Sequence, residues 1–206
     1  MAKEGILFVV IPLILGLFFW FLHISVFFIG LAIILFIFSV YFAFFFRNPN
    51  REICAGPDDI VSPVDGTVLD VVNEGETRRL VVFLSIFNVH ITRMPHEGHM
   101  DKMEYFHGVF LPAYREKASE LNERIILTVK SKNFQYQLKL IAGIAARRIK
   151  MWVNQGEKIP TGKRIGIIMF GSRAELIVPK NVELFVKKSD RVYGGKTLIG
   201  KIKNPE

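Results

Sequence analysis

A run of 42 residues without a single Asp, Glu, Lys or Arg, Gly5–Phe46, limits how the first part of this chain can fold. Twelve of the 19 phenylalanines lie in this run. A helix that crosses a bilayer needs about 20 apolar residues, so the run is too long for one such helix and suits two. His23-Ile24-Ser25 interrupts it, which predicts a turn between helices near Ile6–Leu22 and Val26–Phe46.

The predicted hairpin has two interpretations, because its first helix is short and contains a proline and a glycine that can bend it. It either crosses the bilayer twice or is embedded in one leaflet. Lys3 and Arg47 flank its outer ends, and the positive-inside rule then places both ends in the cytoplasm. We expect residues 1–46 to lie at the cell membrane, without a cleaved signal peptide, and residues 47–206 to lie on its cytoplasmic side.

Residues 47–206 have the composition of a soluble domain rich in β-structure. Short β-prone runs separated by turn signals favour a sandwich or barrel, with hairpins of the kind found in lipoyl domains. The expected strands are Gly66–Val72, Leu80–Phe87, His99–Tyr105, Ile125–Val129, Phe134–Ile141, Arg164–Phe170, Ala174–Val178 and Val182–Val186. A helix is expected over Glu116–Arg124, and a short turn or helix over Ala142–Arg148.

The charge of the chain bears on its partners. Its 27 Lys and Arg residues exceed its 19 Asp and Glu residues, for a formal net charge of +8. The basic residues are scattered and form no run with interleaved aromatics, so an anionic membrane surface is favoured over nucleic acid. A solvated basic face without a partner is the alternative interpretation. The sequence leaves the oligomeric state open, a homo-oligomer included.

Metal and disulfide chemistry find little support in the sequence. The single cysteine, Cys54, excludes a disulfide within the chain and a zinc site built from several cysteines. Four histidines fall within 18 residues, but none forms a helical pair with a nearby carboxylate in a known ligand pattern. These four are His90, His96, His99 and His107. A metal site is therefore not expected.

The most unusual local pattern of the domain is Gly171-Ser172-Arg173, which interrupts two apolar β-runs. Glycine within a strand pattern predicts a bulge or a kink, and on these residues alone that interpretation is favoured. Gly171 also leaves its carbonyl unshielded beside the Ser172 hydroxyl. The bond between these two residues is therefore a candidate reaction site.

Three other stretches hold residues that suit chemistry. Asp65 stands at the start of an expected strand, where it either forms an Asp-Gly turn or orients a histidine. His90 follows an apolar strand and is either a core residue or a catalyst. Arg147 and Arg148 follow a run of small residues and either face solvent or hold a phosphate or carboxylate.

Taken together, five motifs resemble those of the phosphatidylserine decarboxylases, most closely the short form that has an N-terminal apolar hairpin. The motifs are Ser62-Pro-Val-Asp-Gly66, Phe83-Leu-Ser85 followed by His90, Asn122-Glu-Arg124, Ile141-Ala-Gly-Ile-Ala-Ala-Arg-Arg148 and Phe170-Gly-Ser-Arg173. No single motif is decisive, but five in the family's order are highly specific. The resemblance covers essentially the whole chain.

The resemblance implies a proenzyme that cuts itself between Gly171 and Ser172, into a large chain, 1–171, and a small chain, 172–206. Ser172 attacks the Gly171 carbonyl, β-elimination follows, and hydrolysis leaves a pyruvoyl group on the small chain. His90 matches the family's histidine and Asp65 its aspartate. We therefore expect a triad in which the carboxylate orients the histidine that activates the serine.

The resemblance also implies the reaction and its substrate. The pyruvoyl group forms a Schiff base with the amine of phosphatidylserine and acts as an electron sink while CO₂ leaves, so the product is a phosphatidylethanolamine-type lipid. His90 is the expected proton donor. Arg93 stands where long-form relatives often carry a second histidine, so either His90 serves both steps or another residue helps.

The three arginines Arg93, Arg147 and Arg148 are the candidate groups for binding the substrate carboxylate or phosphate. Diacyl phosphatidylserine and an archaeal ether-lipid analogue are equally compatible with the sequence.

A membrane-anchored binding module is the alternative function. The segment Gly156–Gly200 resembles the hairpins of lipoyl and biotinyl domains, which explains its glycines but not Ser172, His90 and Asp65 together. Such a module also needs an exposed lysine at a tight turn, and Phe170-Gly-Ser-Arg173 offers none. The decarboxylase is therefore the preferred hypothesis.

Overall fold

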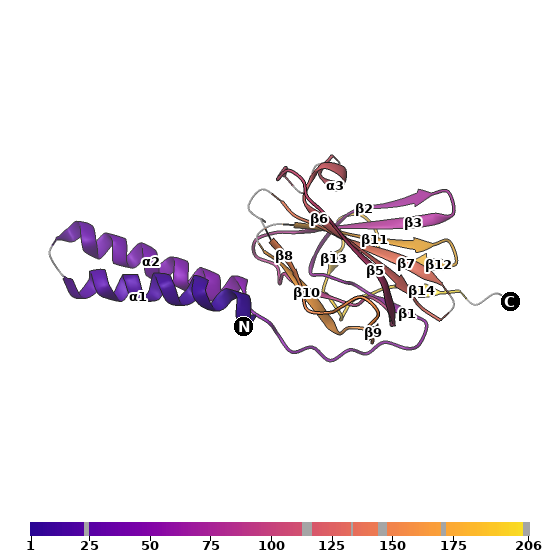
Figure 1. The fold of residues 1–206 in the computed structure, drawn as a ribbon, viewed down its shortest axis with the longest axis horizontal. Helices are drawn as coiled ribbons and strands as arrows, with labels where there is room; N and C mark the ends of the chain where they lie inside the picture. The colour runs from indigo at the N-terminus through magenta and orange to yellow at the C-terminus, as the bar shows by residue number, and fades with distance from the viewer. Residues whose placement is uncertain (23–24, 113–116, 133, 144–147, 170–171, 204–206) are drawn as a thin grey trace. The chain divides into compact units, whose positions relative to one another are not determined.

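The computed structural model describes residues 1–22, 25–112, 117–132, 134–143, 148–169 and 172–203. The chain divides into two compact units, Met1–Asn50 and Arg51–Glu206. The first is helical and the second is mainly β-structure (Figure 1). The predicted fold class, a β-rich domain preceded by an apolar helical hairpin, is confirmed.

The first unit contains a 3-10 turn, Lys3–Gly5, and two helices, α1 (Ile6–Leu22) and α2 (Val26–Phe45). Together with the turn, these helices are long and apolar enough to cross a membrane, judged by length and composition. The Ser39 hydroxyl donates a hydrogen bond of 2.9 Å to the Val9 carbonyl, which joins the two helices. This contact gives the Ser39 hydroxyl a hydrogen-bond partner, which the hydrocarbon of a bilayer cannot provide. His23 and Ile24, part of the predicted turn, lie outside the described residues.

The β domain is built from short strands. They are β1 (Asp59–Val61), β2 (Gly66–Glu74), β3 (Thr77–Leu84), β4 (Ile91–Arg93), β5 (Gly98–Phe106), β6 (Arg124–Lys130), β7 (Gln135–Ile141), β8 (Arg148–Met151), β9 (Lys158–Ile159), β10 (Arg164–Met169), β11 (Ser172–Pro179), β12 (Val182–Leu184), β13 (Arg191–Val192) and β14 (Leu198–Ile202). A short helix, α3 (Ala118–Leu121), completes the described elements.

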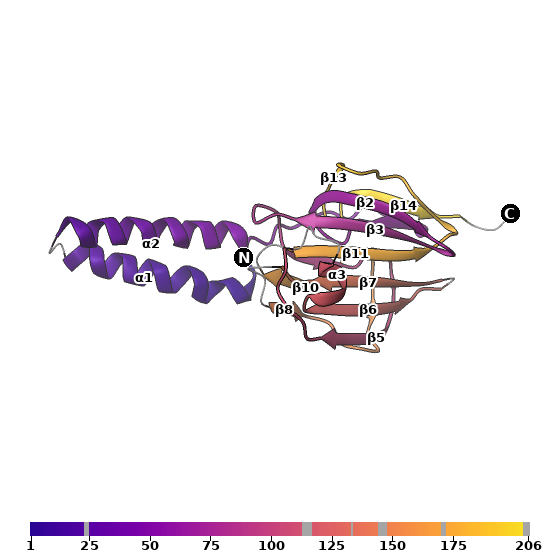
Figure 2. The same ribbon diagram turned by 90° about the horizontal axis from the view of Figure 1, so that it is seen from above.

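These strands form one large curled sheet and two small sheets. The large sheet has the order β13-β2-β3-β11-β7-β6-β5-β9, and Figure 2 shows its middle strands side by side. The small sheets have the orders β1-β14-β12 and β4-β10-β8. The strand pairings within these sheets are antiparallel. The strand order places β11 in the middle of the large sheet, between β3 and β7.

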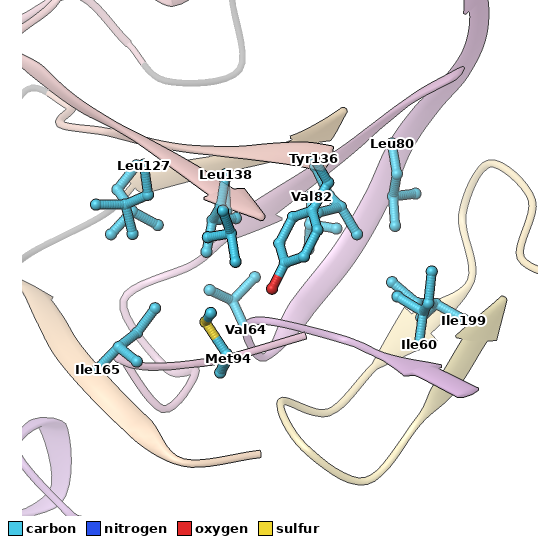
Figure 3. Packing of buried hydrophobic residues seen from close by; sticks show 14 of the residues in the cluster. Ile60, Val64, Leu80, Val82, Met94, Leu127, Tyr136, Leu138, Ile165 and Ile199 are labelled. Carbon is cyan, nitrogen blue, oxygen red and sulfur yellow. The ribbon is translucent and has the colours of Figure 1, made fainter. Parts of the chain in front are cut away.

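The hydrophobic core fills the space between the large sheet and the small sheets. Leu127 of β6 and Leu138 of β7 face Met94 and Ile165 across this interior (Figure 3). All four side chains are fully buried. Because burying one such side chain stabilises a fold by about 1.5–3 kcal/mol, the contact between sheets holds the strand ends in fixed positions.

Several predicted element bounds are wrong, and the simplest case is the strand predicted over Val182–Val186, which ends at Leu184. The strand predicted over Leu80–Phe87 ends at Leu84, because Ser85 and Asn88 close a turn through their own hydrogen bonds. Of the segment Ala142–Arg148, residues 144–147 lie outside the described residues, while Arg148 is the first residue of β8 rather than part of a helix.

The helix predicted over Glu116–Arg124 is also wrong at its end, where α3 stops at Leu121. The cause is Asn122, whose side chain binds main-chain groups instead of continuing the helix. Its amide donates to the carbonyls of Leu111 and Ala142 at 2.8 and 2.7 Å, and its oxygen accepts from the Leu111 N–H at 2.8 Å. Side-chain amides compete with helix hydrogen bonds in this way.

Gly66 allows β2 to approach β3 directly after Asp65. A Cβ atom on this residue would lie 2.2 Å from the Phe83 carbonyl oxygen, which belongs to the main chain and cannot move aside. The start of β2 therefore requires glycine at this position.

We expect Gly66→Ala to destabilise the β domain by about 3 kcal/mol, because the added methyl group overlaps the main chain of β3. Thermal unfolding followed by circular dichroism should show a Tm lower by roughly 6–12 °C. Gly75→Asn is the matched control in the same hairpin. Gly75 has a positive φ of 58°, which asparagine tolerates, and has open space around it. Equal Tm values for the two variants would contradict this account.

Candidate active site

Ser172 is the first residue of β11, the strand between β3 and β7. It pairs with Leu84, the last residue of β3, and its side chain is fully buried. Among the residues that the structure describes, its Oγ atom has no hydrogen-bond partner. An unsatisfied buried hydroxyl costs about 1–3 kcal/mol, so Ser172 occupies a position that folding stability alone would not select.

The bulge predicted at Gly171-Ser172-Arg173 is wrong for the two residues that are described. Ser172 and Arg173 pair in register with Leu84 and Phe83, and the ladder continues without a shift to the end of β11. The prediction took the glycine as a break between two β-runs, whereas Ser172 and Arg173 are already buried members of the second strand. Gly171 itself lies outside the described residues.

Arg173 and Glu175 point away from the core, on the face of β11 opposite Ser172, because side chains alternate along a strand. They are 4% and 1% exposed, and the Nη2–Oε1 distance of their ion pair is 2.6 Å. The Ser119 hydroxyl of α3 donates to Glu175, and an Arg79 nitrogen lies 3.6 Å from the same carboxylate. These groups line a cavity of about 380 Å³ and fix β11 from its outer face.

His90 lies in the segment between β3 and β4 and is fully buried. Its Nδ1 atom is 3.0 Å from the Asn88 carbonyl oxygen. A carbonyl can only accept, so this contact is a hydrogen bond when Nδ1 carries the proton, and Nε2 then holds the lone pair that a general base uses. The main-chain oxygen of Asn88 therefore makes a contact that the predicted triad assigned to a carboxylate.

Two chain segments link the large sheet to the sheet β4-β10-β8, and they bring Ser172 and His90 to one corner of the domain. β3 ends opposite Ser172, and the chain then passes His90 before it enters β4. β10 pairs with β4 and ends at Met169, two residues before Gly171. The His90 carbonyl accepts a hydrogen bond of 3.1 Å from the Ile168 N–H, which ties the two segments together.

Asp65 reaches the same corner just before β2, which pairs with β3. Its carboxylate accepts hydrogen bonds of 2.5 and 2.7 Å from the Arg51 guanidinium and one of 2.8 Å from the Gly194 N–H. Arg51 also donates to the Gly194 carbonyl at 2.6 Å. The described contacts of Asp65 are therefore with the linker and the C-terminal segment, and its role toward His90 stays a prediction.

Arg93 ends β4 and is only 5% exposed, with its guanidinium donating to the Gly162 carbonyl at 2.9 Å. Burial, followed by the nearby charges of Arg164 and Arg51, lowers the pKa of Arg93 to about 10, although Asp65 acts in the opposite direction. Arg93 remains protonated at neutral pH. Arg51 and Arg164 therefore lie near Arg93, and this gathering of arginines suits a phosphate or carboxylate ligand.

Of the other two predicted anion-binding residues, the structure describes only Arg148. Arg147, like Gly171, lies outside the described residues. Arg148 is exposed and pairs with Met169 at the end of β10. It therefore lies on the edge strand of the small sheet, beside the strand end that precedes Gly171.

Sequence reasoning missed three residues of this corner, Asn88, Arg51 and Arg164. Asn88 offered a signal, since serine and asparagine three residues apart after a strand are typical of a side-chain-closed turn. Arg51 and Arg164 offered none, because one lies in a linker and the other at the start of a strand. The fold alone brings both near Arg93.

The fold and this corner describe a candidate enzyme attached to an apolar hairpin, and comparison with known proteins gives its family. A model of the phosphatidylserine decarboxylase family matches residues 38–200. The chain belongs to the phosphatidylserine decarboxylase family.

Individual relatives agree with this assignment. The phosphatidylserine decarboxylase proenzyme of Carboxydothermus hydrogenoformans is 44% identical over 181 residues, covering 84% of this chain and 85% of the relative. That of Ehrlichia chaffeensis is 38% identical over 206 residues, covering 96% and 89%. A protein of Methanosarcina mazei named as an archaetidylserine decarboxylase proenzyme is 39% identical over 160 residues, covering 78% and 74%.

We expect Glu175→Ala to lower the stability of the β domain by about 3 kcal/mol, because it removes the buried carboxylate that faces Arg173. The double variant Arg173→Met/Glu175→Leu should recover most of this loss, since two apolar side chains of similar volume replace the ion pair. Thermal unfolding of the full-length protein in detergent measures both. A double variant as unstable as the single one would show that the pair is not the cause.

Proposed function

We propose that this protein is a membrane-anchored decarboxylase of phosphatidylserine, or of an ether-lipid analogue, that makes a pyruvoyl group from Ser172. The observation that carries the proposal is the buried Ser172 hydroxyl, without a partner among the described residues, at the corner that also holds His90. Membership of the decarboxylase family supports it. The alternative, a binding module without catalysis, is not favoured.

The residues of this corner fit a pyruvoyl group. Ser172 supplies its carbon atoms, and Gly171 before it presents a carbonyl without a shielding side chain. A pyruvoyl group is about as large as the serine that it replaces, so it suits the same buried position at the start of β11. A side-chain hydroxyl already bound to a neighbour would have to break that bond before reacting, and no such bond is seen among the described residues.

In the proposed self-cleavage, His90 accepts the proton of the Ser172 hydroxyl and the oxygen attacks the Gly171 carbonyl carbon. The peptide C–N bond breaks as the ester forms, and the proton goes to the Ser172 nitrogen. A base then removes the Ser172 α-proton, β-elimination releases Gly171 as a carboxylate, and water converts the resulting dehydroalanine to pyruvoyl with loss of ammonia. The Asn88 carbonyl supports this role because it holds the imidazole in the tautomer that the first step requires.

When formed, the pyruvoyl carbonyl supplies an electrophile for the substrate amine and a sink for the electrons that departing CO₂ leaves behind. We assign to His90 the return of a proton to the α-carbon of the headgroup, so that one histidine serves both cleavage and protonation. Its complete burial limits the access of water to that proton.

The arginines of the site are the proposed anion-binding groups. Arg93, Arg147 and Arg148 hold the phosphate or carboxylate of the substrate in this proposal. The position of Arg164 and Arg51 near Arg93 supports this assignment, because guanidinium groups gather at this corner.

The apolar hairpin supports membrane association. We propose that the unit Arg51–Glu206 lies on the cytoplasmic side, because Lys3 and Arg47 flank the hairpin and positive charge is retained on that side. The named relatives include phosphatidylserine and archaetidylserine decarboxylases, so diacyl and ether phosphoserine lipids are the two candidate substrates. Both lipids are assayed with hydrocarbon chains of matched length, and the one with the higher kcat/KM is the substrate.

Wild-type protein is expected to run on a denaturing gel as two fragments, the smaller being residues 172–206 with a terminal carbonyl. Ser172→Ala should remain one intact chain, and His90→Ala should form fragments at least 100-fold more slowly, because it removes the general base. Ser131→Ala, in the turn between β6 and β7, is the control and should cleave like wild type. Mass spectrometry and a carbonyl reagent identify the fragment. An intact wild-type chain that matches Ser172→Ala would refute the proposal.

Asp65→Asn is expected to slow fragment formation at least tenfold, because the proposed triad needs its negative charge. Arg51→Gln removes the arginine that binds Asp65 and should slow cleavage less than threefold. Fragment formation timed on gels distinguishes the two variants, with Tm measured alongside to exclude unfolding. Equal slowing by both would assign Asp65 to the contacts with Arg51 and Gly194 instead of to His90.

A further inference from the structure

The segment between Ser172's partner Leu84 and the candidate base His90 contains a turn that is closed by its own side chains. The Ser85 N–H and hydroxyl donate to the Asn88 side-chain oxygen at 2.9 and 2.7 Å, and the Asn88 N–H donates to the Ser85 carbonyl at 3.0 Å. Because these polar groups are satisfied within the turn, it can enter a less polar environment at low cost. We call residues 85–88 the site turn.

The two residues at the tip of the site turn are apolar and exposed. Ile86 is 42% exposed and Phe87 is 66% exposed, the largest value for any large apolar side chain described in the unit Arg51–Glu206. The preceding Leu84 and the following Val89 are buried. The other exposed apolar residues described in this unit stand singly along the sequence, and single exposed residues are ordinary, whereas an adjacent pair on a closed turn is not.

The tip lies next to both groups that the proposed chemistry uses. Ser172 pairs with Leu84, the residue directly before the turn. His90 follows two residues after the turn, and its ring contacts the carbonyl of Asn88, a residue of the turn itself. Whatever Ile86 and Phe87 touch is therefore held close to the candidate site.

The short linker after α2 indicates that the tip contacts lipid. Five residues, 46–50, separate α2 from the β domain, and a chain of that length reaches about 20 Å when extended. A domain tethered so closely to a hairpin apolar enough to cross a membrane always has lipid within reach. Water-soluble partners have no such guaranteed proximity.

The charges on the neighbouring sheet agree with lipid as the occupant. Ile91 of β4, Ile167 of β10 and Lys150 of β8 form one row across the small sheet, and Arg148 lies on the same edge strand. Lys150 and Arg148 are exposed. An apolar tip accompanied by basic side chains is the pattern of a surface that binds the boundary between headgroups and acyl chains.

We propose that Ile86 and Phe87 insert into the lipid bilayer and hold the candidate site at headgroup depth. The inference deepens the proposed function, on which its meaning for catalysis rests, and names the surface by which the site meets its lipid substrate. Insertion of the tip itself requires no reaction, so it can be measured separately.

The first test places a probe on the tip of the full-length protein. In a Cys54→Ser background, which removes the single cysteine, Phe87→Cys is labelled with an environment-sensitive fluorophore and reconstituted into vesicles containing phosphatidylglycerol. We expect a blue-shifted emission that lipids with a quencher on the acyl chain reduce at least twofold. Phe185→Cys is the control, because Phe185 is also exposed, at 52%. A probe at position 87 quenched no more than one at 185 would overturn the proposal.

The second test measures catalysis with two forms of one headgroup. We expect Ile86→Ser/Phe87→Ser to lose at least tenfold more kcat/KM on long-chain phosphatidylserine in vesicles than on a short-chain, dispersed analogue. Equal losses on both, or none on vesicles, would overturn the role in lipid access. If the probe inserts but wild type decarboxylates neither lipid, the proposed function fails and the insertion stands.

Discussion

The pairing of β11 with β3 on one edge and with β7 on the other sets the position of Ser172. Ladder pairs with β3 run the whole length of β11, and pairs with β7 cover Arg173–Ile177. Its inward side chains belong to the core. If the chain is cut before Ser172, the whole of β11 stays in the small chain and can keep its pairing with β3 and β7 of the large chain, because the cut falls before the first residue of the strand. The proposed self-processing therefore changes one end of a strand and leaves the sheet in place.

This arrangement also explains how the domain tolerates an unsatisfied polar atom. The Ser172 hydroxyl costs about 1–3 kcal/mol in stability. The apolar residues that follow it on the inner face, Ala174, Leu176 and Val178, are each at most 1% exposed, and the larger two stabilise the strand by about 1.5–3 kcal/mol each. The strand therefore stays in place with a reactive group at its end, which is where polar groups without partners are expected to serve function.

The elements that could be predicted from the sequence are those specified by local pattern. The uncharged run predicted both helices to within one residue, and alternating apolar residues predicted the long strands of the large sheet. The short strands β1, β4, β8, β9, β13 and β14 were missed, because two to five residues carry too little periodicity. Most of them, such as β1 with β14 and β4 with β10, pair with partners far along the chain.

The candidate site was predicted through the family resemblance rather than through local pattern. Ser172, His90 and Asp65 come to one corner only because two sheets share the connections between their strands. The contact of Asp65 with Arg51 and that of His90 with Asn88 could not be predicted. Each depends on which of several polar groups the fold places within hydrogen-bonding distance. Sequence spacing does not contain that information.

A lipid substrate places a physical demand on such a buried site. Removing acyl chains from the bilayer costs about 0.8 kcal/mol per CH₂ group, so a diacyl lipid with some thirty of them cannot leave the membrane to find an enzyme. The headgroup stays at the membrane surface, so the reacting atoms of the protein must be brought to it. Ser172 and His90 are fully buried, yet Ser172 pairs with the residue directly before the exposed apolar tip of the site turn. Burial from water and access from lipid are compatible at this corner, because the side of the site that carries Ile86 and Phe87 is the side suited to hydrocarbon.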